Sequence, residues 1–157
     1  MIKVNVVCIG KVKEKYFSAG IEEYAKRLSR FCLFNIAELE EENYQFTDPS
    51  LIEKTKVAEG ERILKHIKGY TVAMAIDGEK LSSEKFAADL KNLFDRGVGE
   101  ITFIIGGSYG LSDAVKRRAD KLLSFSDMTF PHTLFRLILT EQIYRAFSII
   151  NGSAYHK

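Results

Sequence analysis

The sequence predicts an α/β protein with a largely parallel sheet flanked by helices. Three observations lead to this fold class. Short apolar runs, typical of buried strands, alternate along the chain with stretches in which apolar residues recur every three or four positions. Glycine, serine and Asp-Pro mark the boundaries between them. The 157 residues show no repeat, low-complexity segment or linker, so we expect a single domain spanning residues 1–157.

The first half of the chain is expected to form two strands and two helices. Its first helix has apolar residues at three- and four-residue steps, with basic residues on the other side. Asp48 is a suitable N-cap and Pro49 fits the first position of the second helix, although Gly60 weakens the prediction inside it. The polar residues 40–50 are expected to form a mobile loop. The expected elements are strand 2–9, ended by Gly10, helix 16–31, strand 33–39 and a helix from residue 49 to about 67.

The second half continues the alternation. Compact apolar runs predict three more buried strands. Serines cap the two helices between them, Ser82 or Ser83 for the first helix and Ser112 for a short basic one. The expected elements are strand 70–76, a helix to about residue 96, strand 101–105, the short helix after Ser112, strand 122–126 and a long helix from 133 to about 150.

The final helix carries apolar residues around nearly its whole circumference. Such a helix must be buried on more than one side. In so small a protein, another copy packed about a two-fold axis is the simplest second partner, so we expect a homodimer. One apolar stripe is formed by Phe135, Leu139, Ile143, Ala146 and Ile150, and Leu134, Leu137, Ile138, Tyr144 and Ile149 cover much of the remaining surface.

Composition limits the functional classes. The net charge is only +2, so any nucleic-acid binding must rely on local basic clusters. No window approaches the ~18 apolar residues that a membrane span needs, and the N-terminus lacks a signal-peptide pattern, which predicts a cytoplasmic protein. Cys8 and Cys32 are isolated and are expected to be buried, reduced thiols. The scattered histidines lack metal-ligand spacing, so no metal is expected.

The glycine turn in "IIGGSYGLSD" is the most distinctive motif. In parallel α/β sheets ligands bind beyond the carboxyl ends of the strands, and the expected loops 77–79, 106–111 and 126–132 all leave such ends. The glycines could simply shape a tight turn. As a ligand site, the turn matches neither the P-loop nor the dinucleotide-binding fingerprint. No Lys or Arg lies between Gly106 and Val115, so a neutral or cationic ligand held by backbone groups fits better than a phosphate.

Several segments together resemble one protein family. "IGGSYGLS" and "LSFSDMTFPHTLFRLILTEQIYRAFSIINGSAYHK" closely resemble the small SPOUT-class methyltransferases that modify a pseudouridine of bacterial 23S rRNA. The opening "VNVVCIGKVKEKYFSAGIEEYAKRL" and the "VAEGERIL" segment are also similar to that family. The likeness spans essentially the whole chain, and its C-terminal third is the most specific part.

The resemblance implies a C-terminal deep trefoil knot, in which S-adenosylmethionine lies bent among three loops, residues 74–78, 106–110 and 126–131. Ordinary connection rules would not predict such threading. The sulfonium of this cofactor is cationic, in keeping with a turn that lacks basic residues. By family position, the cofactor contacts are Met74, Gly107, Ser126, Asp127, Met128, Thr129, Phe130 and Pro131.

The implied reaction is methyl transfer to N3 of a pseudouridine at the position conventionally numbered 1915 of 23S rRNA. In similar proteins the C-terminal tail reaches the knot of the partner subunit of a homodimer. By this resemblance Tyr155 and His156 are carried over as catalytic residues. An aromatic ring suits an unstacked RNA base, and the titratable imidazole of His156 is the natural candidate for the base that removes the N3 proton. Arg145 could stabilise the deprotonated base, and Glu141 could orient Arg145. The alternatives are a frayed terminus and an exposed ion pair worth only ~0.3–0.5 kcal/mol.

Two basic clusters are candidates for RNA contact, although each could be a solvated face. The chain has no added RNA-binding domain, so the assembled ribosome is a better target than free RNA. The competing hypothesis is a dimeric ribosome-binding module that retains the knot with little or no methyl-transfer activity, and a third is an enzyme that methylates a protein or small molecule. The clusters are Lys11, Lys13 and Lys15 in the first loop, and Lys116, Arg117, Arg118 and Lys121 near the short helix.

Overall fold

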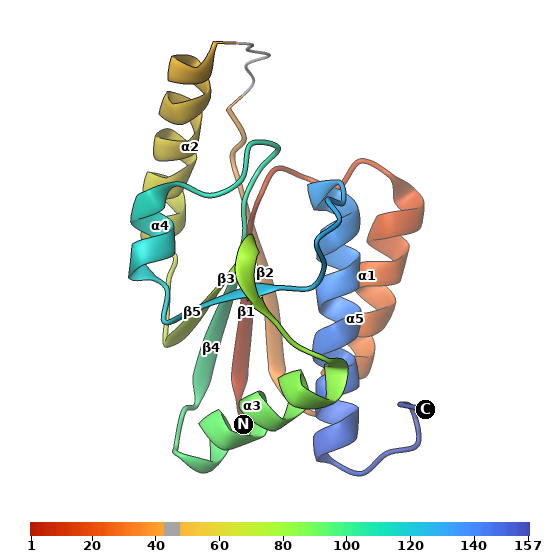
Figure 1. The fold of residues 1–157 in the computed structure, drawn as a ribbon. Helices are drawn as coiled ribbons and strands as arrows, with labels where there is room; N and C mark the ends of the chain where they lie inside the picture. Colours follow the sequence, from red (N-terminus) through yellow and green to blue (C-terminus); the bar gives the residue numbers. More distant parts are fainter. Residues whose placement is uncertain (43–47) are drawn as a thin grey trace.

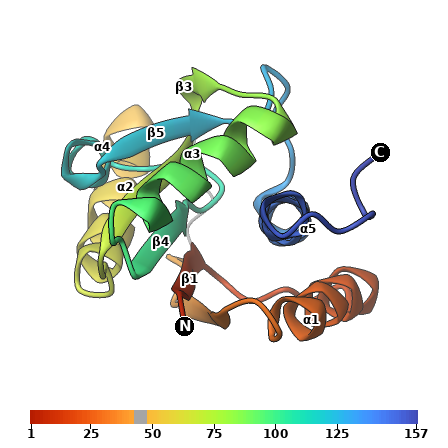
Figure 2. The ribbon, with the colours of Figure 1, turned by 90° about the horizontal axis from the view of Figure 1, so that it is seen from below.

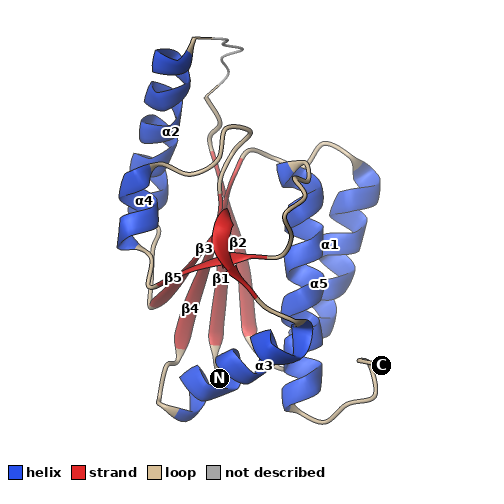
Figure 3. Cartoon of the chain, in the orientation of Figure 1, coloured by secondary structure: helices blue, strands red, loops and turns tan. Residues whose placement is uncertain are grey.

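The structure is a computed structural model that describes residues 1–42 and 48–157. It contains a five-stranded sheet in the order β2-β1-β4-β3-β5, and every pairing between neighbouring strands is parallel (Figure 1, Figure 3). The predicted fold class is therefore confirmed. Part of the predicted mobile loop, residues 43–47, lies outside the described residues.

Each expected element is present, with boundaries that shift by a few residues. The predicted caps of three helices are confirmed: Asp48 accepts a hydrogen bond from the Ser50 amide, Ser82 from the Lys85 amide and Ser112 from the Val115 amide. The elements are β1 (Lys3–Ile9), α1 (Lys15–Leu28), β2 (Leu33–Leu39), α2 (Pro49–Leu64), β3 (Tyr70–Lys80), α3 (Ser83–Asp95), β4 (Glu100–Ile105), α4 (Asp113–Arg118), β5 (Lys121–Ser124) and α5 (His132–Ile150).

Strand β3 is longer than predicted, and this corrects one expected loop. Residues 77–79 were expected to form a loop after the strand, but they lie within β3. The register between β3 and β5 shifts between Met74 and Glu79, so the strand bulges and then resumes its pairing with β5. Gly78 allows β3 to return to β5, since a Cβ at this position would lie 2.6 Å from the backbone nitrogen of Leu123.

Helices cover both faces of the sheet, which explains the continuous apolar runs of its strands. One hydrophobic cluster joins β1, β3 and β4 to α1, α3 and α5, and a second joins the opposite face to α2 and α4 (Figure 2). Alternate residues of β1 serve the two clusters: Val6 and Cys8 lie in the first, and Val7 and Ile9 in the second. Both cysteines are buried and free, as expected.

Helix α5 packs between α1 and α3 of the same chain. Every residue of this helix is buried or partly buried, and its contact with α1 is close enough that a Cβ on Gly20 would meet the Leu137 side chain at 2.9 Å. Its apolar circumference is thus explained by intramolecular partners, and the homodimer stays a prediction that rests on the resemblance. Among the described residues, no helix combines the length and apolar character needed to cross a membrane.

Candidate functional site

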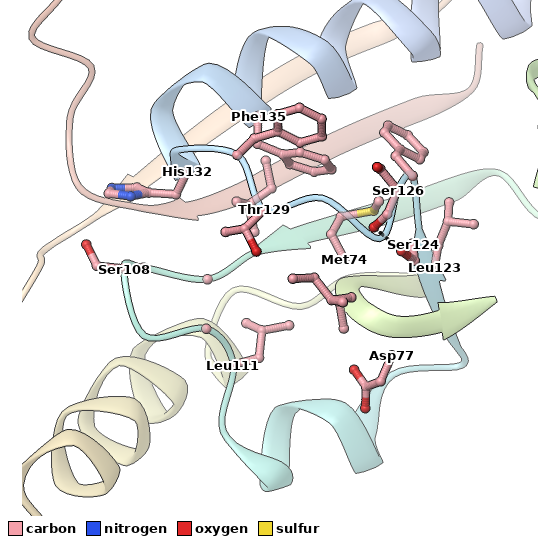
Figure 4. A pocket seen from close by; sticks show the side chains of 18 of the residues that line it. Met74, Asp77, Ser108, Leu111, Leu123, Ser124, Ser126, Thr129, His132 and Phe135 are labelled. Atoms are coloured by element: carbon pink, nitrogen blue, oxygen red, sulfur yellow. Dashed lines mark hydrogen bonds between the residues drawn. The ribbon is translucent and has the colours of Figure 1, made fainter. Parts of the chain in front are cut away.

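A cavity of ≈ 850 Å³ opens beside the bulge of β3 and at the carboxyl ends of β4 and β5 (Figure 4). Its volume lies within the ~300–1,000 Å³ typical of small-molecule sites. Three chain segments supply most of its walls: the bulged part of β3, the glycine turn after β4 and the loop between β5 and α5. They overlap the three segments that the resemblance assigned to the cofactor, residues 74–78, 106–110 and 126–131, although the first belongs to a strand and not to a loop. The charges of the side chains that line the cavity determine which ligand it suits.

The glycine turn brings bare backbone to the cavity. A Cβ on Gly106 would lie 2.8 Å from the backbone of Gly110, and one on Gly107 would lie 2.9 Å from Oε1 of Glu59. Gly110 has a φ of +85°, and its amide donates to the Gly107 carbonyl at 3.0 Å. Simple turn geometry accounts for Gly110, whereas Gly106 and Gly107 are needed because other parts of the chain approach them closely.

The loop between β5 and α5 is shaped by its own hydrogen bonds. The Ser124 hydroxyl donates to the Ser126 carbonyl at 3.0 Å, and the Ser126 hydroxyl accepts from the Met128 amide at 2.9 Å. Phe135, in the first turns of α5, packs its ring 5.4 Å from that of Phe125 and adds an apolar wall. The loop is therefore largely organised before any ligand enters.

The predicted cofactor contacts, with the exception of Asp127, line the cavity. Asp127 forms an ion pair with Lys80, and its side chain is largely exposed. Sequence reasoning did not single out Leu111, Leu123 or Phe135, which also line the cavity. In the sequence these apolar residues cannot be told from ordinary core residues. Only their position at the end of a strand or near the start of a helix sets them apart.

The cavity carries little net charge. Asp77 and Lys116 line it and pair with each other, with 3.3 Å between Nζ and Oδ1. His132, at the start of α5, is half-buried there, and this burial lowers its pKa, so the imidazole is neutral at pH 7. A paired charge and a neutral ring do not form a phosphate site. They fit a ligand that is bound through backbone groups and apolar contacts.

The four predicted catalytic residues lie together in a second cluster. Arg145 donates to Oε1 of Glu141 at 2.9 and 2.6 Å, and the Tyr155 hydroxyl donates to the same oxygen at 3.0 Å. Nη1 of Arg145 lies 2.9 Å from Nδ1 of His156. The side chains of Glu141 and Arg145 are only 18% and 24% exposed, so they form part of a network and not an exposed surface pair.

Tyr155 is a neutral phenol in this cluster. Partial burial, together with hydrogen bonds to Tyr24 and Glu141, raises its pKa. Its ring packs edge-on against that of Tyr144, at 4.8 Å between centroids. The hydrogen bond to Glu141 correspondingly raises the pKa of Arg145, which stays cationic. The tail is therefore held by specific contacts and is not a frayed end.

This cluster is separate from the cavity of its own chain. None of its four residues belongs to the cavity lining, all of which lies in the described part of the chain. Glu141 is about 14 Å along the α5 axis from His132. After α5 the chain reverses, with the Ser153 amide bonded to the Ser148 carbonyl at 2.9 Å, and the C-terminus lies beside the lower half of α5 in Figure 1, whereas the cavity loop enters its upper end.

Comparison with known proteins identifies the family to which this architecture belongs. The model of one family, described as "Predicted SPOUT methyltransferase", matches residues 2–156, almost the whole chain. The chain belongs to the SPOUT methyltransferase family. The expected resemblance is thereby confirmed.

Curated relatives of this SPOUT methyltransferase cover its full length. A protein from Lactobacillus delbrueckii subsp. bulgaricus named Ribosomal RNA large subunit methyltransferase H is 52% identical, across 99% of this chain and 100% of its own length. A protein of the same name from Limosilactobacillus reuteri is 50% identical with the same coverage.

Solved structures share the fold at low sequence identity. A methylase family protein from Haemophilus influenzae Rd KW20 aligns with a TM-score of 0.54 and 13% identity, over 100% of this chain and 72% of its own. A methyltransferase from Legionella pneumophila, solved with its bound cofactor SAM, aligns with a TM-score of 0.52 and 9% identity, over 95% of this chain and 66% of its own. These likenesses show the SPOUT methyltransferase fold alone.

Proposed function

We propose that this protein uses S-adenosylmethionine to methylate N3 of a pseudouridine, at position 1915 of bacterial 23S rRNA, on the assembled ribosome. The cavity formed by the bulge of β3, the glycine turn and the loop between β5 and α5 carries this proposal. Full-length relatives named as ribosomal RNA large subunit methyltransferases support the class of substrate. The threading of the loops into a trefoil knot is part of the same proposal.

The cavity fits the cofactor in shape and in charge. Gly106, Gly107 and Gly110 place backbone without side chains at the cavity wall, and Lys116, the lysine among the described lining residues, is paired with Asp77 and so adds little repulsion to a sulfonium. S-adenosylmethionine supplies an activated methyl group on that sulfonium. The residues that would hold it are Met74, Gly107, Ser126, Met128, Thr129, Phe130 and Pro131, with Asp127 next to them in the loop.

The substrate side of the site requires groups beyond those that hold the cofactor; in the cavity, Asp77 and Lys116 pair with each other and His132 is a half-buried neutral imidazole. N3 of the base carries a proton and becomes a nucleophile only after losing it, so a base or a positive group nearby is needed. Arg145, Tyr155 and His156 offer a cation, an aromatic ring and an imidazole, but they lie away from the cavity of their own chain. Their separation favours a homodimer in which the tail of one subunit completes the cavity of the other.

Fewer basic residues are available to bind RNA than the two basic clusters suggested. Lys116 pairs with Asp77, and Lys121 pairs with Asp89 at 2.8 Å and with Glu79 at 3.2 Å. These two lysines are already neutralised within the chain. The RNA backbone would instead meet the exposed cations of the first loop and of α4, which are Lys11, Lys13, Lys15, Arg117 and Arg118.

Labelled methyl transfer to ribosomes that lack the modification tests the proposal. We expect label in 23S rRNA and, after digestion to nucleosides, in N3-methylpseudouridine. Label in peptides or free nucleosides with unlabelled ribosomes would refute the substrate. Calorimetry with S-adenosylmethionine addresses the alternative of an inactive ribosome-binding module, because such a module has no need to bind the cofactor.

A further inference from the structure

The imidazole of His156 lies between a cation and a carboxylate. Nη1 of Arg145 is 2.9 Å from Nδ1, and Oε1 of Glu84, in the first turn of α3, is 2.7 Å from Nε2. The His156 side chain is 24% exposed, so both contacts lie at the edge of the protein and not in open solvent. The two ring nitrogens therefore face partners of opposite hydrogen-bonding character.

These partners determine where the ring carries its proton. A guanidinium has only donors, so the Arg145 contact is a hydrogen bond only if Nδ1 offers a lone pair. A proton on Nδ1 would place two donors 2.9 Å apart. The single proton of the neutral ring is then on Nε2, which donates to Glu84. The hydrogen bond from His156 also lowers the pKa of Glu84, so its carboxylate is ionised at neutral pH and accepts.

Arg145 is itself held firmly in place. Two hydrogen bonds tie it to Glu141, and its guanidinium lies 4.7 Å from the centroid of the Tyr155 ring. The groups that face His156 are thus Arg145 and, behind it, Glu141 and Tyr155 on one side, with Glu84 on the other. Glu84 is 65% exposed and can be replaced as the acceptor by a ligand. The Nδ1 contact is fixed, whereas the Nε2 contact is exchangeable.

We propose that His156 acts as a neutral hydrogen-bond donor through Nε2–H, and not as the base that removes the N3 proton, with Arg145 as the positioning residue that fixes its tautomer. This inference rests on the proposed function. The lone pair of the ring is occupied by Arg145, so it cannot accept the N3 proton. Nε2–H instead leaves Glu84 and donates to a carbonyl oxygen beside N3, stabilising the anion that forms when N3 gives its proton to solvent water.

Nitrogen NMR of the full-length protein tests the tautomer without any activity. The ring nitrogens of His156 are assigned by comparison with the spectrum of His156→Gln. At pH 8 we expect a protonated Nε2 and a bare Nδ1, and Arg145→Ala should give a mixture of the two tautomers. A proton on Nδ1, or on both nitrogens, would overturn the proposal.

Replacement of His156 tests its role in transfer. Glutamine keeps an N–H donor at a reach similar to Nε2 but cannot act as a base, whereas alanine has neither property. We expect His156→Gln to transfer methyl groups to ribosomes at least tenfold faster than His156→Ala. Equal loss in the two variants, with wild-type protein active, contradicts a donor role.

A control variant and the NMR readout separate failure of this inference from failure of the proposed function. His66→Gln makes the same chemical change at an exposed histidine after α2, and should transfer methyl groups as wild-type protein does. If wild-type protein transfers nothing to ribosomes, the proposed function fails, while the NMR result still decides the tautomer.

Discussion

Two buried charged side chains, Glu59 and Arg136, lie behind the loops of the cavity. Glu59, on α2, is 3% exposed, and its Oε1 has no hydrogen-bond partner among the described residues although it closely approaches Gly107. Arg136, on α5, is 1% exposed and binds Glu38 and the carbonyls of Ile9 and Gly10 at the end of β1. Sequence reasoning assigned neither residue a role, because burial is what gives each of them its importance.

Gly107→Ala should weaken cofactor binding at least tenfold. The new Cβ would lie 2.9 Å from Glu59 Oε1 and 3.3 Å from a methyl group of Ile9, so the turn must shift or the neighbours must move, at a cost of about 1–3 kcal/mol. Calorimetry with S-adenosylmethionine measures the effect. Gly99→Ala is the matched control, since a Cβ there meets nothing within 4 Å. Equal affinities for the two variants would show that the turn tolerates a side chain.

Glu59→Gln should stabilise the protein more at pH 8 than at pH 5. Burial raises the pKa of Glu59 in the folded state, so the folded chain holds this proton more tightly than the unfolded chain, and stability declines as pH rises through the interval between the two pKa values. Glutamine does not ionise, so the variant does not lose stability in this way as the pH rises. Thermal unfolding at the two pH values tests the difference, with the exposed Glu61→Gln as control. A gain that is the same at both pH values contradicts the assignment.

At the scale of elements, α2 and α4 pack so closely that a glycine is required between them. A Cβ on Gly60 would lie 2.5 Å from Oγ of Ser112, the residue that caps α4, and 3.2 Å from Val115. In the sequence, Gly60 weakened the prediction of α2. In the structure it is the position at which that helix meets the start of α4, directly after the glycine turn.

Gly60→Ala is therefore expected to lower the free energy of unfolding by about 1–3 kcal/mol. Helix propensity alone predicts the opposite sign, because alanine is favoured over glycine by ~1 kcal/mol within a helix. Urea denaturation decides between these signs. Adding Ser112→Ala should recover part of the loss, since it removes the clashing hydroxyl, even though the cap is lost. Additive effects of the two changes would argue against the contact.

At the scale of the whole molecule, the cavity lies at the N-terminal end of α5, whereas the tail cluster lies beside its middle and C-terminal half. This arrangement gives the proposed homodimer a testable consequence. Two impaired variants, Gly107→Ala with weakened cofactor binding and Tyr155→Ala with an altered tail, should restore activity when their subunits are mixed and assayed at a cofactor concentration too low to occupy the Gly107→Ala cavity. Random pairing makes about half of the dimers mixed, each with one intact site, so about a quarter of wild-type activity is expected.

Methyl transfer to ribosomes measures this complementation after the subunits have been exchanged. Each variant alone, at the same limiting concentration of S-adenosylmethionine, serves as the control and should gain no activity from the same treatment. If mixing restores nothing while native mass spectrometry confirms mixed dimers, each chain must use its own tail, and the shared site is wrong.

The sequence alone determined the order and type of the elements, the caps of α2, α3 and α4, and two of the three cavity segments, the glycine turn and the loop between β5 and α5. Periodicity, capping residues and strand ends are local properties, so they can be read from neighbouring residues. Only the tertiary structure decided how β3 bulges around β5, why Gly60 and Gly107 carry no side chain, which charges are buried, and that Arg145 and Glu84 hold opposite sides of His156. Those features depend on residues far apart in the chain, whose contacts arise only when complete helices and strands pack together.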